Sequence, residues 1–104
     1  MSSEQAATRS SGQVVRVGPV LDTSREGRAV LAAICRSNAQ VEVIERGAYS
    51  RVLVPGCCVV TRRAIEDALG SAFVFPADLE AVMPAFKGFL RLDPERVEWR
   101  CERV

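Results

Sequence analysis

The sequence contains no histidine among its 104 residues. Histidine is the commonest general base and metal ligand in proteins, and Ser-His and Cys-His nucleophile arrangements both require it. The phosphate-binding patterns G-x-G-x-x-G and G-x-x-x-x-G-K-[ST] are missing too. These absences exclude most hydrolytic and nucleotide-dependent mechanisms. We therefore assign no catalytic, cofactor-binding or metal-binding residue.

Lysine is scarce as well, because Lys87 is the single lysine and the other basic residues are arginines. Fourteen basic residues against thirteen acidic ones leave a net charge of +1. Such a balance gives no strong long-range attraction to nucleic acid or to an anionic membrane. The planar arginine side chain suits bidentate pairing with carboxylates at protein interfaces, although a GC-rich genome would produce the same bias.

Long apolar runs are also missing, and no segment reaches the eighteen apolar residues expected of a membrane span. Residues 1–12 are polar, lack the apolar stretch of a secretory signal, and are expected to form a flexible N-terminal tail. Residues 13–104 are expected to fold as one domain, because a chain of this length supports one core. The expected location is the cytoplasm.

The four cysteines show no C-x₂-C pair of the kind that binds zinc or an iron–sulfur cluster. Cys57 and Cys58 are adjacent on a predicted strand, where successive side chains point to opposite faces, so they are not expected to bind one ion together. We favour small buried side chains as their role. A reactive thiol and a metal site remain as alternatives.

In the first half of the chain, β-branched residues predict a strand over 14–20. Apolar residues at three- and four-residue spacing then predict a helix over 24–36. Alternating valines at 41–43 and 52–54, separated by Gly47, predict a hairpin.

In the second half, residues 57–60 form a short apolar run, and Thr61 can cap a helix that Gly70 ends. Residues 76–84 predict one or two helical turns followed by a loop. A second hairpin is expected around the turn at 93–96. The order β-α-β-β-(β)-α-α-β-β predicts an α+β domain of the β-α-β-β-α-β-β type, with two main helices and a mostly antiparallel sheet.

Six short motifs follow one another along the chain: VGPVL at 17–21, AVLAAI with SNA at 37–39, GAYSRVLVPG at 47–56, VTRRAIEDALGSAF at 60–73, DLE at 78–80 and AFKG at 85–88. With these motifs in this order, the chain from Gly18 onward resembles a known family, the small effector, or coupling, proteins of bacterial multicomponent di-iron monooxygenases. It looks most like the toluene and alkene monooxygenase branch. There are two departures: residues 69–73 lack the basic residue of the family's L-G-[RK]-x-F, and residues 85–88 read A-F-K-G in place of S-F-A-G.

The resemblance implies a cofactor-free regulatory protein that catalyses nothing itself. Such a protein binds the di-iron hydroxylase component of a toluene-, alkene- or phenol-type monooxygenase, as in aromatic-hydrocarbon catabolism. Binding shifts hydroxylase helices, controls the reaction with oxygen and couples electron use to hydroxylation. The implied partner is the hydroxylase, with no nucleic acid and no membrane, and the free protein is expected to be a monomer.

The resemblance also implies a set of hydroxylase-interface residues, each with a structural alternative. The alternatives are a helix C-cap for the asparagine, a sheet-surface pair for the tyrosine and its neighbouring arginine, and a core position for the phenylalanine. The alternative for the glycine is a turn position, and the alternative for each glutamate is a solvated or locally paired position. The implied interface residues are Asn38, Tyr49, Arg51, Arg62, Glu66, Glu80, Phe86 and Gly88.

Arg62 and Arg63 lie at the predicted start of a helix, where the helix dipole disfavours positive charge. A carboxylate from another surface could offset this unfavourable interaction.

Two other functions stay open. One is a small ligand-sensing or RNA-binding α+β module, although none of the six aromatic residues lies in a stacking strand of the RNA-recognition type. The other is a thiol-dependent enzyme that uses Cys57 or Cys58.

Overall fold

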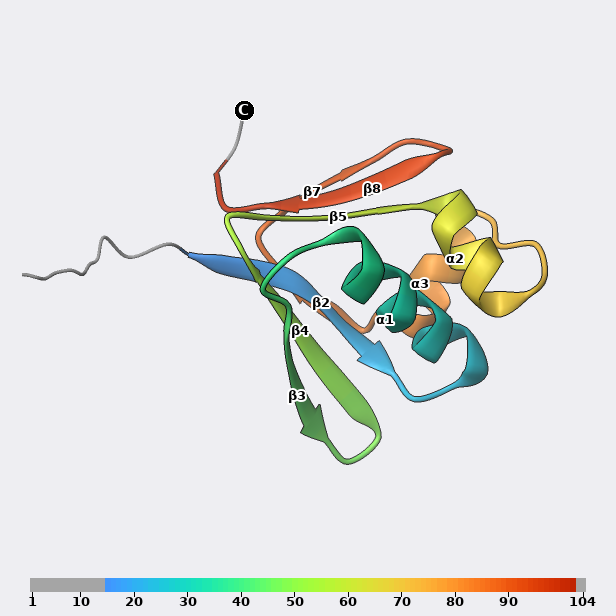
Figure 1. Cartoon of the computed structure of the whole chain (residues 1–104), viewed down its shortest axis with the longest axis horizontal. Coiled ribbons are helices and arrows are strands. Elements are labelled where there is room, and N and C mark those ends of the chain that lie inside the picture. The colour runs from blue at the N-terminus through green and yellow to red at the C-terminus, as the bar shows by residue number, and fades with distance from the viewer. Residues whose placement is uncertain (1–14, 103–104) are drawn as a thin grey trace, which may run out of the picture.

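The strands of the protein divide between two antiparallel sheets, with helices at one end (Figure 1). The structure is a computed structural model that describes residues 15–102, so the expected tail at 1–12 lies outside the described residues. The elements are β2 (Arg16–Asp22), α1 (Arg25–Ser37), β3 (Glu42–Arg46), β4 (Tyr49–Pro55), β5 (Cys57–Thr61), α2 (Arg62–Leu69), α3 (Ala77–Val82), β6 (Ala85–Lys87), β7 (Phe89–Leu92) and β8 (Arg96–Arg100).

The α+β class and both hairpins are confirmed, but the single predicted sheet is split in two. One sheet has the strand order β3-β4-β2-β6 and the other has the order β5-β8-β7. In Figure 1 the sheets spread apart toward one end, and α1, α2 and α3 lie at that open end. Alternating side chains show that a strand has two faces, but not which sheet it joins.

Local side-chain chemistry determines where the two main helices begin and end. The Ser24 side chain accepts a hydrogen bond from Gly27 N at 3.0 Å and so caps α1. Thr61 caps α2 in the same way, through Ala64 N at 3.1 Å. Gly70 ends α2 in the left-handed conformation, with φ 82°. Each cap satisfies backbone groups that a helix end leaves unpaired.

The core lies between the inner faces of the two sheets and the buried face of α1. Every second residue of β2 and β4 points inward, and Val17, Val52 and Val54 are buried with Ile34 of α1 and Trp99 of β8. This arrangement leaves the opposite face of the four-stranded sheet with exposed and half-buried side chains. No helix among residues 15–102 is long and apolar enough to cross a membrane.

The prediction of a loop after α3 is wrong, because residues 85–87 form strand β6. This strand pairs with β2, with Pro19 opposite Phe86 and Val20 opposite Ala85. Three residues are too few to show an alternating pattern, and the pairing depends on a strand more than sixty positions earlier. Gly88, with φ 111°, then turns the chain from β6 in one sheet into β7 in the other.

Candidate functional site

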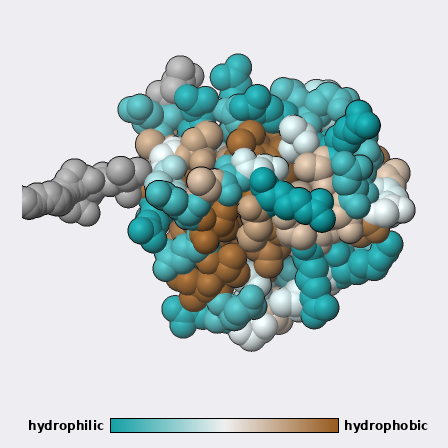
Figure 2. All heavy atoms as spheres, in the orientation of Figure 1, coloured by the Kyte–Doolittle hydropathy of each residue, from teal (hydrophilic) through white to brown (hydrophobic). Residues whose placement is uncertain are grey.

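The outer face of the four-stranded sheet, which points away from the core, is the candidate site. The register places Arg51 of β4 between two apolar neighbours, with Val20 of β2 on one side and Ile44 of β3 on the other. Tyr49 lies opposite Arg46 across the β3–β4 hairpin. Paired residues project from the same side of a sheet, so these five side chains share the outer face. Figure 2 shows one side of the molecule, on which hydrophobic residues near the β3–β4 hairpin lie among hydrophilic ones.

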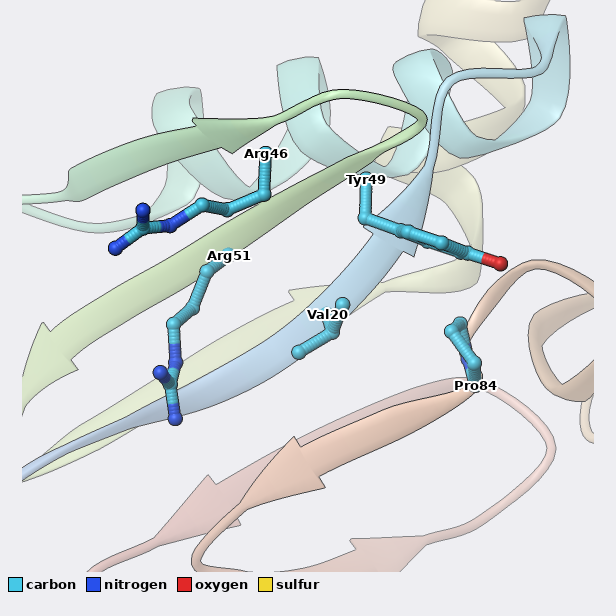
Figure 3. Close-up of a pocket in the computed structure, with 5 residues that line it drawn as sticks. All are labelled: Val20, Arg46, Tyr49, Arg51 and Pro84. Carbon is cyan, nitrogen blue, oxygen red and sulfur yellow. The ribbon is translucent and has the colours of Figure 1, made fainter.

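A groove opens on this outer face. It has a volume of about 430 Å³ and is lined by Val20, Arg46, Tyr49, Arg51 and Pro84. Figure 3 shows that the Tyr49 ring extends toward Pro84, whereas the two arginine side chains extend the other way. The tyrosine is 45% exposed. The groove therefore has an apolar end and a cationic end.

The carboxylates that share this face already have partners within the chain. Glu42 pairs with Arg16 at 2.7 Å. Asp22 accepts two hydrogen bonds from the N-cap residue of α1, at 3.0 and 2.5 Å. Within residues 15–102, neither Arg46 nor Arg51 forms an ion pair, so the groove keeps a positive charge that no neighbour neutralises.

Asn38, by contrast, binds within the chain. Its side-chain nitrogen donates to the carbonyl oxygens of Ile34 at 2.9 Å and Val59 at 2.8 Å, and its oxygen accepts from Val59 N at 3.1 Å. The side chain therefore acts as the C-cap of α1 and joins that helix to β5. Both hydrogens of its side-chain nitrogen are donated within the chain. The structure therefore agrees with the structural alternative for Asn38, a helix C-cap.

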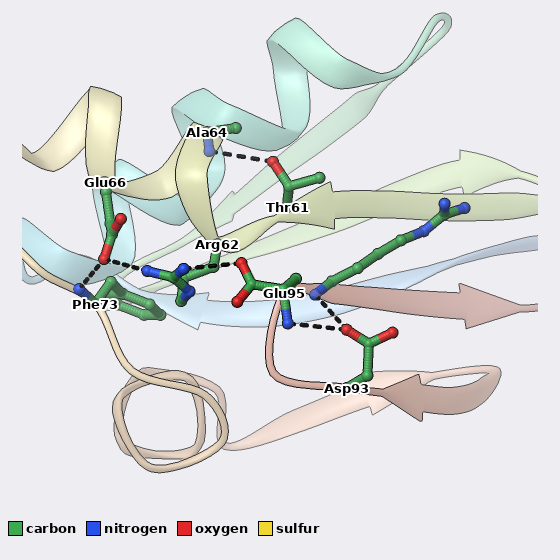
Figure 4. A network of polar contacts seen from close by, with 8 residues as sticks. Thr61, Arg62, Ala64, Glu66, Phe73, Asp93 and Glu95 are labelled. Carbon is green, nitrogen blue, oxygen red and sulfur yellow. Dashed lines mark hydrogen bonds and ion pairs between the residues drawn. The ribbon is translucent and has the colours of Figure 1, made fainter.

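Arg62 and Glu66 also meet partners within the chain (Figure 4). Arg62 lies 2.8 Å from Glu66 and 2.8 Å from Glu95, and Glu66 accepts from Phe73 N at 2.9 Å. The Phe73 N–H and the nearby guanidinium hold the pKa of Glu66 below its usual value. Hydrogen bonding to Glu95 and the charge of Glu66 raise the pKa of Arg62. The carboxylates that offset this arginine at the helix start therefore come from the same chain.

The remaining interface candidates lie elsewhere. Phe86 pairs with Pro19, which faces the core side of the sheet, so Phe86 does not share the face of Tyr49. It is 43% exposed at the edge strand, so the core alternative is wrong. A Cβ on Gly88 would lie 2.8 Å from Arg100 O, which explains this glycine by close packing. Glu80 is exposed on α3, and its side chain has no hydrogen bond or ion pair among the described residues.

Sequence reasoning missed Arg46, Val20 and Pro84 as parts of the groove. Arg46 could have been found, because a tight turn at Gly47 places it opposite Tyr49 on the same face. Pro84 could not, because only the pairing of β6 with β2 brings the end of α3 to this sheet.

The cysteines divide as their positions on β5 predict. Cys57 is exposed and Cys58 is buried. Burial, with smaller contributions from Cys57 and Cys35, raises the pKa of Cys58 to about 12. A thiol with such a pKa is almost fully protonated at neutral pH and is a poor nucleophile. Among residues 15–102, no group of histidine, cysteine or acidic side chains is arranged to hold a metal ion.

Comparison with known proteins adds a family and a relative. The model of the MmoB/DmpM family matches residues 15–100. The chain is 40% identical over 85 residues to the alkene monooxygenase system effector subunit of Xanthobacter autotrophicus (strain ATCC BAA-1158 / Py2). That match covers 80% of this chain and 83% of the relative.

Solved structures share the fold at lower identity. Two chains from structures of a phenol hydroxylase–regulatory protein complex superpose with TM-scores of 0.72 and 0.66, at 18% and 22% identity. They match 85% and 84% of this chain and 98% and 100% of their own. The soluble methane monooxygenase regulatory protein B gives a TM-score of 0.63 at 20% identity, covering 98% of this chain and 74% of that protein.

Proposed function

Because the chain belongs to the MmoB/DmpM family, we propose that it is the non-catalytic effector component of a multicomponent monooxygenase and binds the di-iron hydroxylase of that system. The observation that carries the proposal is the match to this family over residues 15–100, supported by 40% identity to an alkene monooxygenase effector subunit. The ligand-sensing or RNA-binding alternative has no comparable support. A thiol-dependent enzyme is wrong, because the relatives are effector and regulatory subunits.

The proposed mechanism uses contact alone. A protein that binds one conformation of the hydroxylase more tightly than another shifts the hydroxylase toward the first. A coupling free energy of ~1–3 kcal/mol corresponds to a shift of 5- to 150-fold. Such a shift is enough to change how the di-iron centre reacts with oxygen and how many electrons reach product. No cofactor on the effector is needed.

The interface candidates divide into two proposed roles. Tyr49, Arg51, Glu80 and Phe86 are exposed, and we assign them to direct contact with the hydroxylase. Tyrosine and arginine are enriched among the residues that dominate binding energy. The other four hold the surface in shape by internal bonds or close packing, and they are Asn38, Arg62, Glu66 and Gly88. We place the protein in the cytoplasm and expect a monomer when it is free.

The test is a reconstituted assay with the cognate hydroxylase, reductase and ferredoxin. Hydroxylated product and consumed oxygen are measured with and without the chain, and an unrelated protein of similar size serves as the control. The proposal predicts a faster rate and a higher ratio of product to oxygen. No change in either quantity would reject it.

A further inference from the structure

We infer that the groove of Val20, Arg46, Tyr49, Arg51 and Pro84 binds an acidic amphipathic helix of the hydroxylase, which seats an apolar side chain against Tyr49 and pairs its carboxylates with the two arginines. The inference rests on the proposed function and names the chemistry of the partner surface. It also adds Arg46, Val20 and Pro84 to the interface.

The apolar end of the groove supplies the anchor site. Tyr49 is 45% exposed, and its ring extends toward Pro84 beside Val20 (Figure 3). An apolar side chain placed there removes surface from water on both partners. A tyrosine has few rotatable bonds, so little conformational entropy is lost when it is covered. This end of the groove therefore favours one apolar side chain of the partner.

The cationic end requires carboxylates from the partner. Arg16 already pairs with Glu42, and Asp22 already accepts bonds from the cap of α1, so residues 15–102 leave no unpaired carboxylate on this face for Arg46 or Arg51. Covering an arginine with a neutral surface would leave a buried charge without a partner, which is strongly unfavourable. A partner that covers this groove must therefore bring its own acidic side chains.

The geometry of the arginines favours a helix as the source of those acids. Arg46 lies opposite Tyr49, and Arg51 lies opposite Ile44, so the two arginines are diagonal neighbours on adjacent strands. Diagonal neighbours lie about 7–8 Å apart. Acidic residues at i and i+4 of a helix are about 6 Å apart, within reach of two long arginine side chains. The groove lies on the face of the sheet, so a partner strand that paired with the backbone of the edge strand β3 would lie beside the groove and would not fill it.

Arg28 provides a matched control for charge. It is exposed on α1, away from the groove, and has no ion pair among the described residues. Arg28→Glu changes the net charge of the protein by the same amount as Arg46→Glu or Arg51→Glu. A difference between them therefore reports the local contact and not the overall field.

The experiment measures the Kd of the full chain for the purified cognate hydroxylase by calorimetry, at low and at physiological salt. Circular dichroism first confirms that every variant is folded. Arg46→Glu and Arg51→Glu should each weaken binding by about tenfold or more, and Arg28→Glu by less than about threefold. Exchanging the facing helix carboxylate of the hydroxylase for arginine should restore binding to Arg51→Glu.

Two results would overturn the inference, and they differ in what else they reject. If the wild-type chain binds but both groove variants bind as tightly as Arg28→Glu, the groove assignment fails and the proposed function stands. If the wild-type chain does not bind the hydroxylase at all, the proposed function fails with it.

Discussion

At the scale of single residues, Gly88 is constrained both by its backbone conformation and by its packing. Its φ of 111° is one that other residues rarely adopt, and a Cβ there would lie 2.8 Å from Arg100 O and 3.0 Å from a methyl group of Val17. The chain passes from one sheet to the other at this point. Both backbone strain and steric overlap therefore oppose a side chain.

Gly88→Ala should lower the free energy of unfolding by about 2 kcal/mol or more, because it meets both penalties. Gly47→Ala is the matched control, since Gly47 also has a positive φ, 62°, but a Cβ there would meet nothing within 4 Å. Its cost should stay near 1 kcal/mol. Urea unfolding followed by the fluorescence of the single tryptophan, Trp99, measures both. Equal losses would show that the close packing at Gly88 is unimportant.

Which face a residue takes was predictable from the sequence, but its partner usually was not. Alternation correctly placed Tyr49 with Arg51, and Cys57 opposite to Cys58. Nothing in the sequence indicated that Asn38 would bond to Val59, twenty-one positions away. Such pairs form only when the helix has packed on the sheet, so short-range patterns do not contain them.

At the scale of elements, Arg62 and Glu66 of α2 and Glu95 in the turn before β8 join two parts of the chain (Figure 4). Glu66 also binds the backbone of Phe73, which fixes the segment after α2. The network thereby ties α2 to the segment that follows it and to the turn before β8. Because the Glu66 carboxylate must be ionised to form these bonds, part of the free energy of unfolding depends on pH.

The pKa of Glu66 is lowered from an ordinary value of 4.5. A carboxyl with a lowered pKa stabilises the folded state above that ordinary value, and the contribution is lost as pH falls through the lowered pKa. Glu66→Gln should therefore lower the melting temperature at pH 7, and its difference from wild type should shrink as pH falls below 4.5.

Glu80→Gln is the control for this series, because the Glu80 side chain is exposed and has no bonding partner among residues 15–102. Its melting temperature should follow that of the wild type at every pH. A constant difference between Glu66→Gln and wild type across pH 3–7 would contradict the assignment of the stabilisation to the ionised carboxylate.

The boundaries of α2 were predictable because caps are local, and the structure confirms Thr61 and Gly70 in those roles. For α1 the sequence offered Asp22, Thr23 or Ser24 as the cap, and the structure shows that it is Ser24. Strand β6 and the division into two sheets were not predictable. Both depend on which strands pair across long stretches of chain, and that choice is made by packing on a shared core. The groove depends on the same pairing, so Tyr49 and Arg51 were identified without Arg46 and Pro84.

At the scale of the whole molecule, the fold covers one face of the four-stranded sheet with the core and leaves the other open. The open face carries an exposed tyrosine and two arginines without ion pairs among the described residues. A small, rigid domain with such a face can act on a larger enzyme by binding alone. Its effect must then appear in the chemistry of the partner and not in any reaction of its own.

The most direct measurement of that effect is a single turnover of the hydroxylase without its electron-transfer partners. The hydroxylase is chemically reduced, mixed with oxygen and substrate, and assayed for product per di-iron centre with and without a saturating amount of this chain. The account predicts a faster reaction with oxygen and more product per reduced centre when the chain is present. Identical oxygen kinetics and product yield in the two samples would contradict it.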